Sequence, residues 1–209
     1  MGGWKRASEV TDAKLFDGQV NYQDITQGML GDCYFLSAMS VLPERHIREM
    51  IITISNPEEW RKVGCFCVCF YKNGKAEFVI IDDFFPTLAN GEWAFVKGGS
   101  NKNELWSMVL EKAYAKLNGS YAYIEAGKVQ YALADMTDGF PEQIDLKRSV
   151  KNVETLWESM LSIKSHGGLM GAGSPENAMG DSAISEEGIV QGHAYAVLQL
   201  ELVDGYKLL

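Results

Sequence analysis

Residues 27–36 read QGMLGDCYFL and place a cysteine between a loop with two glycines and an apolar run. Apolar residues recur at helical spacing after the cysteine, and Pro43 ends the pattern. Asp32 is therefore predicted to be the N-cap of a helix, which puts Cys33 in the first turn. The dipole and the free N–H groups at that end of a helix favour the thiolate form that a nucleophilic cysteine needs.

A lone cysteine is more often a buried structural residue, so a catalytic interpretation of Cys33 requires a base. His46 lies in a charged helical run and is expected to be a solvated surface residue. His166 follows a predicted helix and is expected to cap its C-terminus. His193 opens a predicted strand 160 residues after the cysteine, a distance typical of cysteine proteases whose nucleophile and base come from different lobes. The spacing alone is equally compatible with a core histidine.

The composition of the 209 residues is that of a globular protein, with 46% hydrophobic and 22% charged residues. The net charge of −9, without a basic cluster, argues against nucleic-acid binding and against an electrostatic membrane anchor. No apolar run approaches the length of a membrane span, and the N-terminus lacks the apolar segment of a secretory signal.

Three further cysteines, Cys65, Cys67 and Cys69, alternate along one predicted strand and share one face of it. Neighbours of this kind lie too far apart for an easy disulfide. A metal site is the alternative, but the spacing matches no common zinc pattern. We predict three buried thiols in a reducing, intracellular setting.

The hydrophobic patterns predict an α+β fold. The segment 134–139, which contains Asp and Gly, marks a boundary between two lobes, residues 1–138 and 139–209. The elements that we predict are helices over 33–42, 44–52, 103–118 and 153–165, strands over 64–71, 75–82, 168–173 and 193–200, and hairpin turns at Asn73-Gly74 and Asp204-Gly205.

Residues 27–36 also resemble the nucleophile segment of the calpain family of intracellular cysteine proteases. Residues 104–121 are similar to that family's central helix, and residues 82–87 and 192–195 match further motifs in family order. The resemblance implies a papain-like fold with a helical nucleophile lobe and an incomplete, β-rich histidine lobe. It implies that Cys33 is the nucleophile, that His193 is the general base, and that Gln27 donates its amide to the oxyanion hole.

Two positions depart from the family pattern. Tyr34 stands where the family has tryptophan after the catalytic cysteine. The family's third triad residue, an asparagine in an Asn-Pro-Trp-Gly motif after the histidine strand, has no counterpart in the 209 residues. We therefore expect the chain to be a truncated core with weak or no activity.

The resemblance further implies a calcium site in the first lobe. Its ligands would be the side chains of Asp24 and Glu104 and the backbone carbonyls of Phe16 and Gly18, which are hard oxygen donors of the kind that calcium prefers. The loop from Gly18 to Asp24 is one residue longer than usual for the family. The alternatives are a turn residue for Asp24 and, for Glu104, an acid in the first turn of a helix.

The leading functional hypothesis is a calpain-like, calcium-dependent endopeptidase that acts on protein or peptide substrates through an acyl-enzyme. The alternative is a catalytically impaired calpain-like module that binds or regulates other proteins. A different thiol acyl-transfer enzyme on the same fold lacks a supporting motif. Regulatory domains or a regulatory subunit are expected outside the 209 residues.

Overall fold

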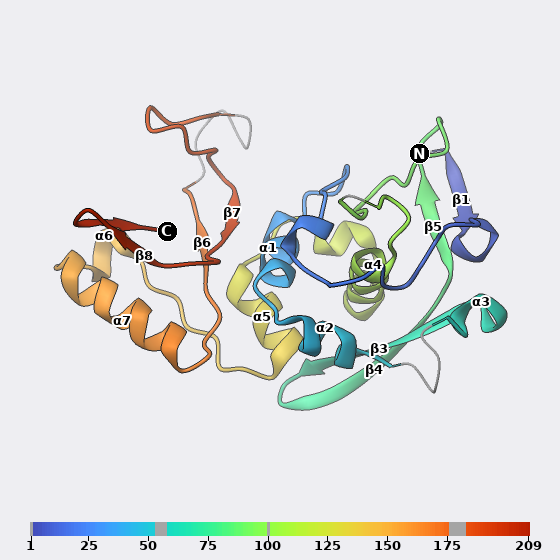
Figure 1. Ribbon diagram of the computed structural model, residues 1–209, viewed down its shortest axis with the longest axis horizontal. Helices are drawn as coiled ribbons and strands as arrows, with labels where there is room; N and C mark the ends of the chain where they lie inside the picture. Colours follow the sequence, from blue (N-terminus) through green and yellow to red (C-terminus); the bar gives the residue numbers. More distant parts are fainter. Residues whose placement is uncertain (1, 53–57, 100, 176–182) are drawn as a thin grey trace.

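The computed structural model describes residues 2–52, 58–99, 101–175 and 183–209. Helices and short antiparallel sheets alternate along the chain, so the α+β prediction is confirmed at that level. In Figure 1, helices α1, α4 and α5 lie together, a long curved hairpin runs beneath them, and α7 lies at the opposite end from the N-terminus.

Helix α1 spans Cys33–Ser40, and Asp32 is its N-cap, as predicted. The Asp32 side chain nevertheless makes no capping hydrogen bond. Pro43 is the N-cap of α2, Glu44–Met50. The next two residues were predicted to continue this helix but form strand β2, Ile51–Ile52, because their β-branched side chains pair with β3.

The predicted hairpin is confirmed as β3, Cys65–Lys72, and β4, Lys75–Asp82. Its turn residues Asn73 and Gly74 have φ angles of 52° and 72°, as a type I′ turn requires. The strands form an antiparallel sheet in the order β2-β3-β4. Phe66, Val68 and Phe70 face the core, whereas the three cysteines of β3 lie on the opposite face and are half-buried free thiols. The prediction of three buried thiols is therefore wrong.

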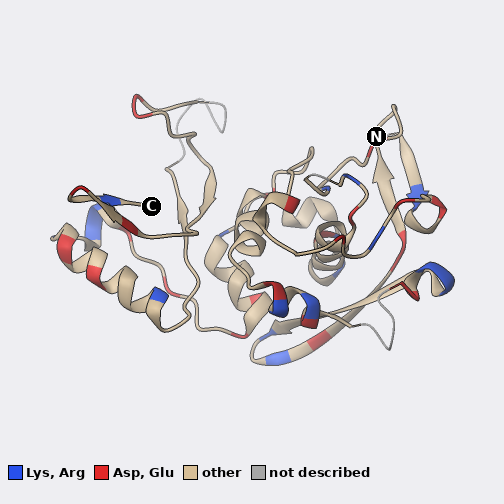
Figure 2. Ribbon diagram, in the orientation of Figure 1, with Lys and Arg blue, Asp and Glu red and all other residues tan. Residues whose placement is uncertain are grey.

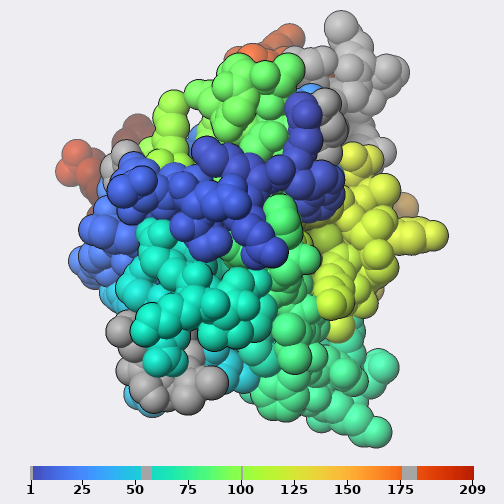
Figure 3. Space-filling model, turned by 90° about the vertical axis from the view of Figure 1, so that its right-hand side faces the viewer, coloured from blue at the N-terminus to red at the C-terminus, as the bar shows by residue number. Residues whose placement is uncertain are grey.

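Strand β1, Gly3–Arg6, pairs antiparallel with β5, Phe84–Thr87, and neither strand was predicted. Pro86 suggested a break, but a two-stranded sheet has room for a residue without an N–H group. An ion pair of 2.5 Å between Arg6 Nη1 and the buried Asp83 Oδ1 anchors this sheet. Figure 3 shows the N-terminal residues in blue, packed between the cyan and green segments that follow them in the chain.

Helix α4, Trp106–Asn118, is the central element, as its apolar stripe predicted. The Phe35 ring of α1 stacks on the Tyr114 ring of α4 with centroids 4.2 Å apart. Helix α5, Val129–Thr137, was not predicted and packs against α1. The largest fully buried side chains are Leu15, Phe35, Met39, Ile47, Ile51, Phe70, Phe85, Leu105, Trp106, Leu110, Ile124 and Met136.

The chain after α5 contributes little to this core, since Val197 is the only buried residue among those described from 139 onward. Helix α7 has its predicted bounds, and the hairpin at Asp204-Gly205 is present. The elements of this part are α6, Leu146–Ser149, α7, Val153–Ser165, β6, Gly171–Gly173, β7, Ala194–Ala196, β8, Glu201–Val203, and β9, Tyr206–Leu208.

The remaining elements are short. They are α3, Trp60–Val63, and the 3-10 helices Ala7–Glu9, Tyr22–Asp24 and Tyr121–Ile124. Figure 2 shows basic and acidic residues interspersed on α2 and α7. Within the described ranges, no helix combines the length and the apolar character that crossing a membrane requires.

Candidate active site

Cys33 is the first residue of α1 and is half-buried. Because the first N–H groups of a helix have no intrahelical acceptor, its backbone N–H is free to donate to a ligand. The loop before it is fixed by a hydrogen bond of 2.9 Å from the Ala126 N–H to the Gly31 carbonyl. A thiol and a free N–H group thus share one residue at a fixed helix terminus.

Gln27 lies on a loop that is fastened on both sides. Thr26 exchanges two backbone hydrogen bonds with Lys97, and the Met29 N–H donates to the Ala94 carbonyl at 3.0 Å. The Gln27 side chain donates from Nε2 to the Leu30 carbonyl at 2.8 Å. A primary amide has two N–H groups, so one remains for a second acceptor.

His193 is held through its backbone by Ser174, the residue that follows β6. Its N–H donates to the Ser174 hydroxyl at 3.0 Å, and its carbonyl accepts from the Ser174 N–H at 2.9 Å. The imidazole is half-buried and meets the Tyr195 ring edge-on, with centroids 5.1 Å apart. None of the described residues hydrogen-bonds to either ring nitrogen, so both are available for proton transfer.

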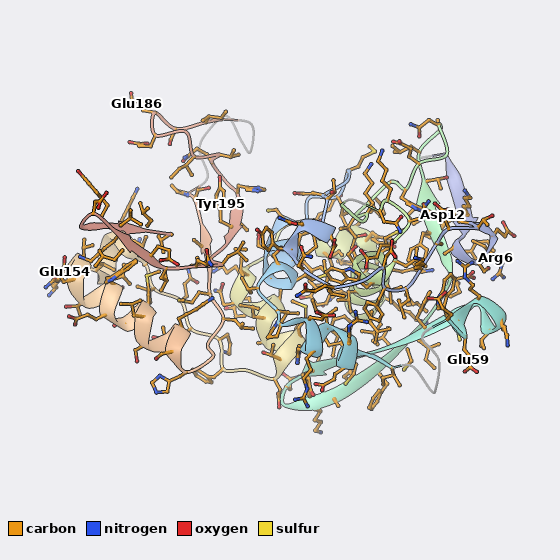
Figure 4. All side chains as sticks on the ribbon, in the orientation of Figure 1. Arg6, Asp12, Glu59, Glu154, Glu186 and Tyr195 are labelled. Carbon is orange, nitrogen blue, oxygen red and sulfur yellow. The ribbon has the colours of Figure 1, made fainter. Side chains whose placement is uncertain are left out.

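One side-chain hydrogen bond connects the helix of the cysteine to the strand of the histidine. The Ser37 hydroxyl on α1 donates to the Ala194 carbonyl on β7 at 2.9 Å. Ser37 is one turn after Cys33 on the same side of the helix, and Ala194 is adjacent to His193. The bond therefore joins the helix that begins with the predicted nucleophile to the strand that directly follows the predicted base. Figure 4 shows Tyr195 of β7 between Glu154 at one end of the molecule and Arg6 and Asp12 at the other.

The other two histidines have structural partners. His46 is not the solvated surface residue that we predicted, since its Nε2 lies 2.8 Å from the Met136 carbonyl near the end of α5. Its helix packs beside that terminus, and the ring uses a free carbonyl there. His166 is the C-cap of α7, with Nδ1 2.8 Å from the Ser162 carbonyl, as predicted.

Asp24 and Glu104, the predicted calcium ligands, are both buried. Glu104 Oε1 accepts from the Asp17 N–H at 2.7 Å, and Asp24 Oδ2 accepts from the Asn21 N–H at 2.9 Å. Burial raises the pKa of Glu104, and the nearby charges of Asp24 and Asp17 raise it further. A cation beside these carboxylates would relieve their repulsion.

One of the two predicted carbonyl ligands, that of Gly18, already accepts a hydrogen bond. The Gly18 carbonyl accepts from Arg48 Nη2 at 2.7 Å, and the same guanidinium lies over the Phe16 ring, 4.4 Å from its centroid. In the part of the chain that the structure describes, no group of three His, Cys, Asp or Glu side chains is arranged to hold a metal ion. The two buried carboxylates fit calcium, whereas the Gly18 carbonyl fits it only when Arg48 moves away.

Sequence reasoning missed Asp32 and Glu111 as a pair. Asp32 is fully buried, and Glu111, in the middle of α4, is 2% exposed. Burial raises the pKa of Asp32 to about 7, and burial together with the charge of Asp32 raises the pKa of Glu111 well above its ordinary value. The sequence did contain a signal for the burial of Glu111. Met108 and Tyr114 lie three residues before and after it, so Glu111 falls on the apolar side of its helix.

Comparison with known proteins adds a family relationship. A sequence profile described as calpain family cysteine protease matches residues 2–208. The chain is 44% identical over 217 residues to the calpain-type cysteine protease ADL1 of Oryza sativa subsp. japonica, covering 98% of this chain and 10% of that protein. It is 34% identical to calpain-5 of Mus musculus and 33% identical to the calpain-2 catalytic subunit of Macaca fascicularis. Each match covers 96% of this chain, but only 33% and 28% of those relatives.

Proposed function

Because the chain belongs to the calpain family of cysteine proteases, we propose that Cys33 is the nucleophile and His193 the general base of a peptide-bond hydrolysis. The observation that carries this proposal is the hydrogen bond from Ser37 to Ala194, which ties the helix that Cys33 opens to the strand that follows His193. Among the described residues the ring nitrogens of His193 have no hydrogen-bond partner, and part of the Cys33 residue is exposed, which suits both groups to proton transfer.

In the first half of the reaction, the Cys33 sulfur attacks the carbonyl carbon of the peptide bond and its proton passes to His193. Negative charge develops on the carbonyl oxygen. The backbone N–H of Cys33 and the second amide N–H of Gln27 donate to that oxygen, while Leu30 orients the Gln27 amide. His193 then gives its proton to the leaving amine, and an acyl-enzyme remains on Cys33.

In the second half, water attacks the acyl carbon as His193 accepts one of the water's protons. The same two donors stabilise the second oxyanion. Its collapse releases the carboxylic acid product, and the proton returns from His193 to the Cys33 sulfur. The cycle consumes one peptide bond and one water molecule and leaves the protein unchanged.

The architecture proposed for this chemistry is papain-like, with residues 1–138 as the nucleophile lobe and 139–209 as part of the histidine lobe. It is supported by the concentration of buried side chains before residue 139 and by the Ser37 bond across the two parts. Protein or peptide substrates, further domains or a regulatory subunit, and an intracellular location are proposed from the family membership. The four free thiols fit a reducing compartment.

Alkylation of the cysteines tests the catalytic proposal. Cys33 and the three cysteines of β3 are all half-buried, so β3 supplies controls of similar accessibility within one molecule. Burial raises the pKa of Cys67 and Cys69, and a neighbouring thiol raises each pKa further. We expect iodoacetamide to label Cys33 fastest, as measured by peptide mass spectrometry, and His193→Ala to slow that labelling alone.

Equal labelling of all four cysteines, or a rate at Cys33 that is unchanged in His193→Ala, would contradict the catalytic proposal. That outcome would favour the alternative of a binding or regulatory module. Casein cleavage by the same preparations, with Cys33→Ser as the blank, then measures whether the nucleophile turns over.

Calcium binding is proposed at Asp24 and Glu104, supported by two buried carboxylates whose mutual repulsion a cation would relieve. When bound, calcium supplies positive charge that fixes the loop between Phe16 and Asp24. Titration calorimetry should detect binding that Glu104→Gln abolishes and Glu49→Gln, an exposed control, preserves. Arg48→Ala should strengthen binding because it frees the Gly18 carbonyl. Absence of binding heat in all of these proteins would refute the site.

A further inference from the structure

Asp32, the residue before the proposed nucleophile, and Glu111 on α4 are buried carboxyl groups that take no part in the steps above. Both side-chain oxygens of Asp32 are buried, and no described N–H or O–H group is aligned to donate to them. Asp32 is 0% exposed and Glu111 is 2% exposed. Ionised carboxylates without donors are costly in such surroundings, so this arrangement requires a partner that carries a proton.

The partner is the other carboxyl. Asp32 and Glu111 each precede by three residues one of the two stacked rings, Phe35 and Tyr114, which join α1 to α4. A hydrogen bond between the two carboxyls is among the causes of both pKa shifts. Two ionised carboxylates have only acceptors, and a hydrogen bond between them exists only when one is protonated. The other titratable groups that face the pair are Tyr34 on α1 and Tyr121 after α4, whose pKa values are both raised by burial. Neither supplies a positive charge that would stabilise two carboxylates.

Glu111 has a second contact on its other side. Its Oε1 accepts from the Val96 N–H at 3.1 Å. Val96 lies between Ala94 and Lys97, the two residues whose backbone holds the loop on either side of Gln27. On its first side Glu111 faces Asp32, which is the residue directly before Cys33.

We propose that Glu111 is a positioning residue for the oxyanion hole, which shares a proton with Asp32 and accepts from Val96. The bridge sets the separation of the two donors, the Cys33 N–H and the Gln27 amide, through one rigid side chain on α4. Loss of the shared proton would leave two negative charges in a site without water. Their repulsion would move the Cys33 N–H and the Gln27 amide apart. The inference rests on the proposed function for its catalytic consequence, but proton sharing is a property of the folded chain alone.

The proton shared by Asp32 and Glu111 makes the free energy of unfolding depend on pH in a defined direction. Both carboxyls have higher pKa values in the folded protein than the value of about 4 that they have when unfolded. Their contribution is therefore fully present below about pH 4 and is lost as the pH rises through the folded pKa values. The loss at Asp32 extends to about pH 7, and Glu111, whose pKa is also raised, adds to the loss.

Glu111→Gln tests the proton without removing either contact, because the amide donates permanently to Asp32 and its oxygen still accepts from Val96. We expect the difference in Tm, variant minus wild type, to increase as the pH rises from 5 to about 7. Parallel Tm profiles of the two proteins would overturn the shared proton whether or not either cleaves peptides.

Glu111→Ala tests the positioning role, with Ser107→Ala as the matched control, because Ser107 is also buried on α4 but makes no part of the bridge. For a preparation that cleaves casein, kcat should fall about tenfold or more in Glu111→Ala with KM nearly constant, as expected for impaired oxyanion donors. Glu111→Gln should recover most of that loss and show weaker inhibition at alkaline pH. The contradicting outcome is an equal kcat in Glu111→Ala and Ser107→Ala, which would overturn the positioning role. If no preparation cleaves casein, the rate at which an activated ester acylates Cys33 makes the same comparison, because acylation passes through an oxyanion.

Discussion

Gln27 is oriented by the residue three positions after it. Its Nε2 could in principle be exchanged with Oε1 by a half-turn of the amide, which would point an acceptor at the substrate oxygen. The 2.8 Å bond to the Leu30 carbonyl is possible only when nitrogen faces that carbonyl. The backbone thus fixes which end of the amide is a donor, and the second N–H points away from Leu30 for use elsewhere.

Gln27→Ala is therefore expected to lower kcat by about 10²–10³-fold with little change in KM, as loss of one oxyanion donor does. The loop should remain in place because its anchors, Thr26 and Met29, bind through their backbones. Gln23→Ala is the control, since Gln23 is an exposed glutamine four residues earlier. Steady-state kinetics on a casein-derived peptide makes the measurement, and equal effects of both substitutions would exclude Gln27 from the oxyanion hole.

At the scale of elements, α1 is positioned by what its serines bind. Ser37 and Ser40 lie on the same helix and both donate to a carbonyl at 2.9 Å. The acceptor of Ser40 is Leu36 within the helix, whereas the acceptor of Ser37 is Ala194 on β7. Only one of the two bonds determines how the helix sits against the histidine strand.

Ser37→Ala should leave the Ala194 carbonyl without its donor and cost about 1 kcal/mol of unfolding free energy. It should also slow the alkylation of Cys33, because the base is less firmly held beside the helix. Ser40→Ala removes only a local bond and should leave the alkylation rate unchanged. Denaturant unfolding and mass spectrometry give the two readouts. If the two variants alkylate at the same rate, the Ser37 bond does not set the geometry of the site.

Gly28 is the second element-scale constraint, because the loop approaches the backbone of residues 94–97 closely. A Cβ at Gly28 would lie 2.2 Å from the Phe95 carbonyl oxygen, whereas a Cβ at Gly31 would meet nothing within 4 Å. Gly28→Ala should cost about 1–3 kcal/mol and displace Gln27, with a fall in kcat. Gly31→Ala should change neither quantity by much, although it lies nearer the cysteine. Urea unfolding and kinetics test both variants, and a Gly28→Ala protein of normal stability would show that the loop has room to move.

Local signals explain which elements could be predicted. The Asn73-Gly74 turn specified its hairpin, and apolar periodicity gave α7 its bounds. Strands β1 and β5 could not be predicted because neither has an alternating pattern and each depends on a partner about 80 residues away. Among the candidate site residues, Asp32 was recognised as an N-cap but not as the partner of Glu111, since that contact also joins distant parts of the chain.

The whole molecule combines two kinds of packing. Helices α1 and α4 are surrounded by core, and nine residues of α4 are buried. Helix α7 has the same length as α4, but none of its residues is buried. The proposed nucleophile therefore lies on a part of the chain with many buried side chains. The proposed base lies on a part with few, where Ser37 and Ser174 make hydrogen bonds to residues 193 and 194.

This contrast predicts very different amide hydrogen exchange in two helices of equal length. Burial of apolar side chains is what makes local opening costly, so amides in the middle of α4 should open only with the whole core. Amides of α7 should exchange at least about a hundredfold faster, because little apolar surface is exposed when it opens. Exchange measured by mass spectrometry on the intact chain compares peptides from 108–117 with peptides from 155–164. Equal protection of the two helices would mean that residues 139–209 share the stability of the core, and that the histidine strand is held as rigidly as Cys33.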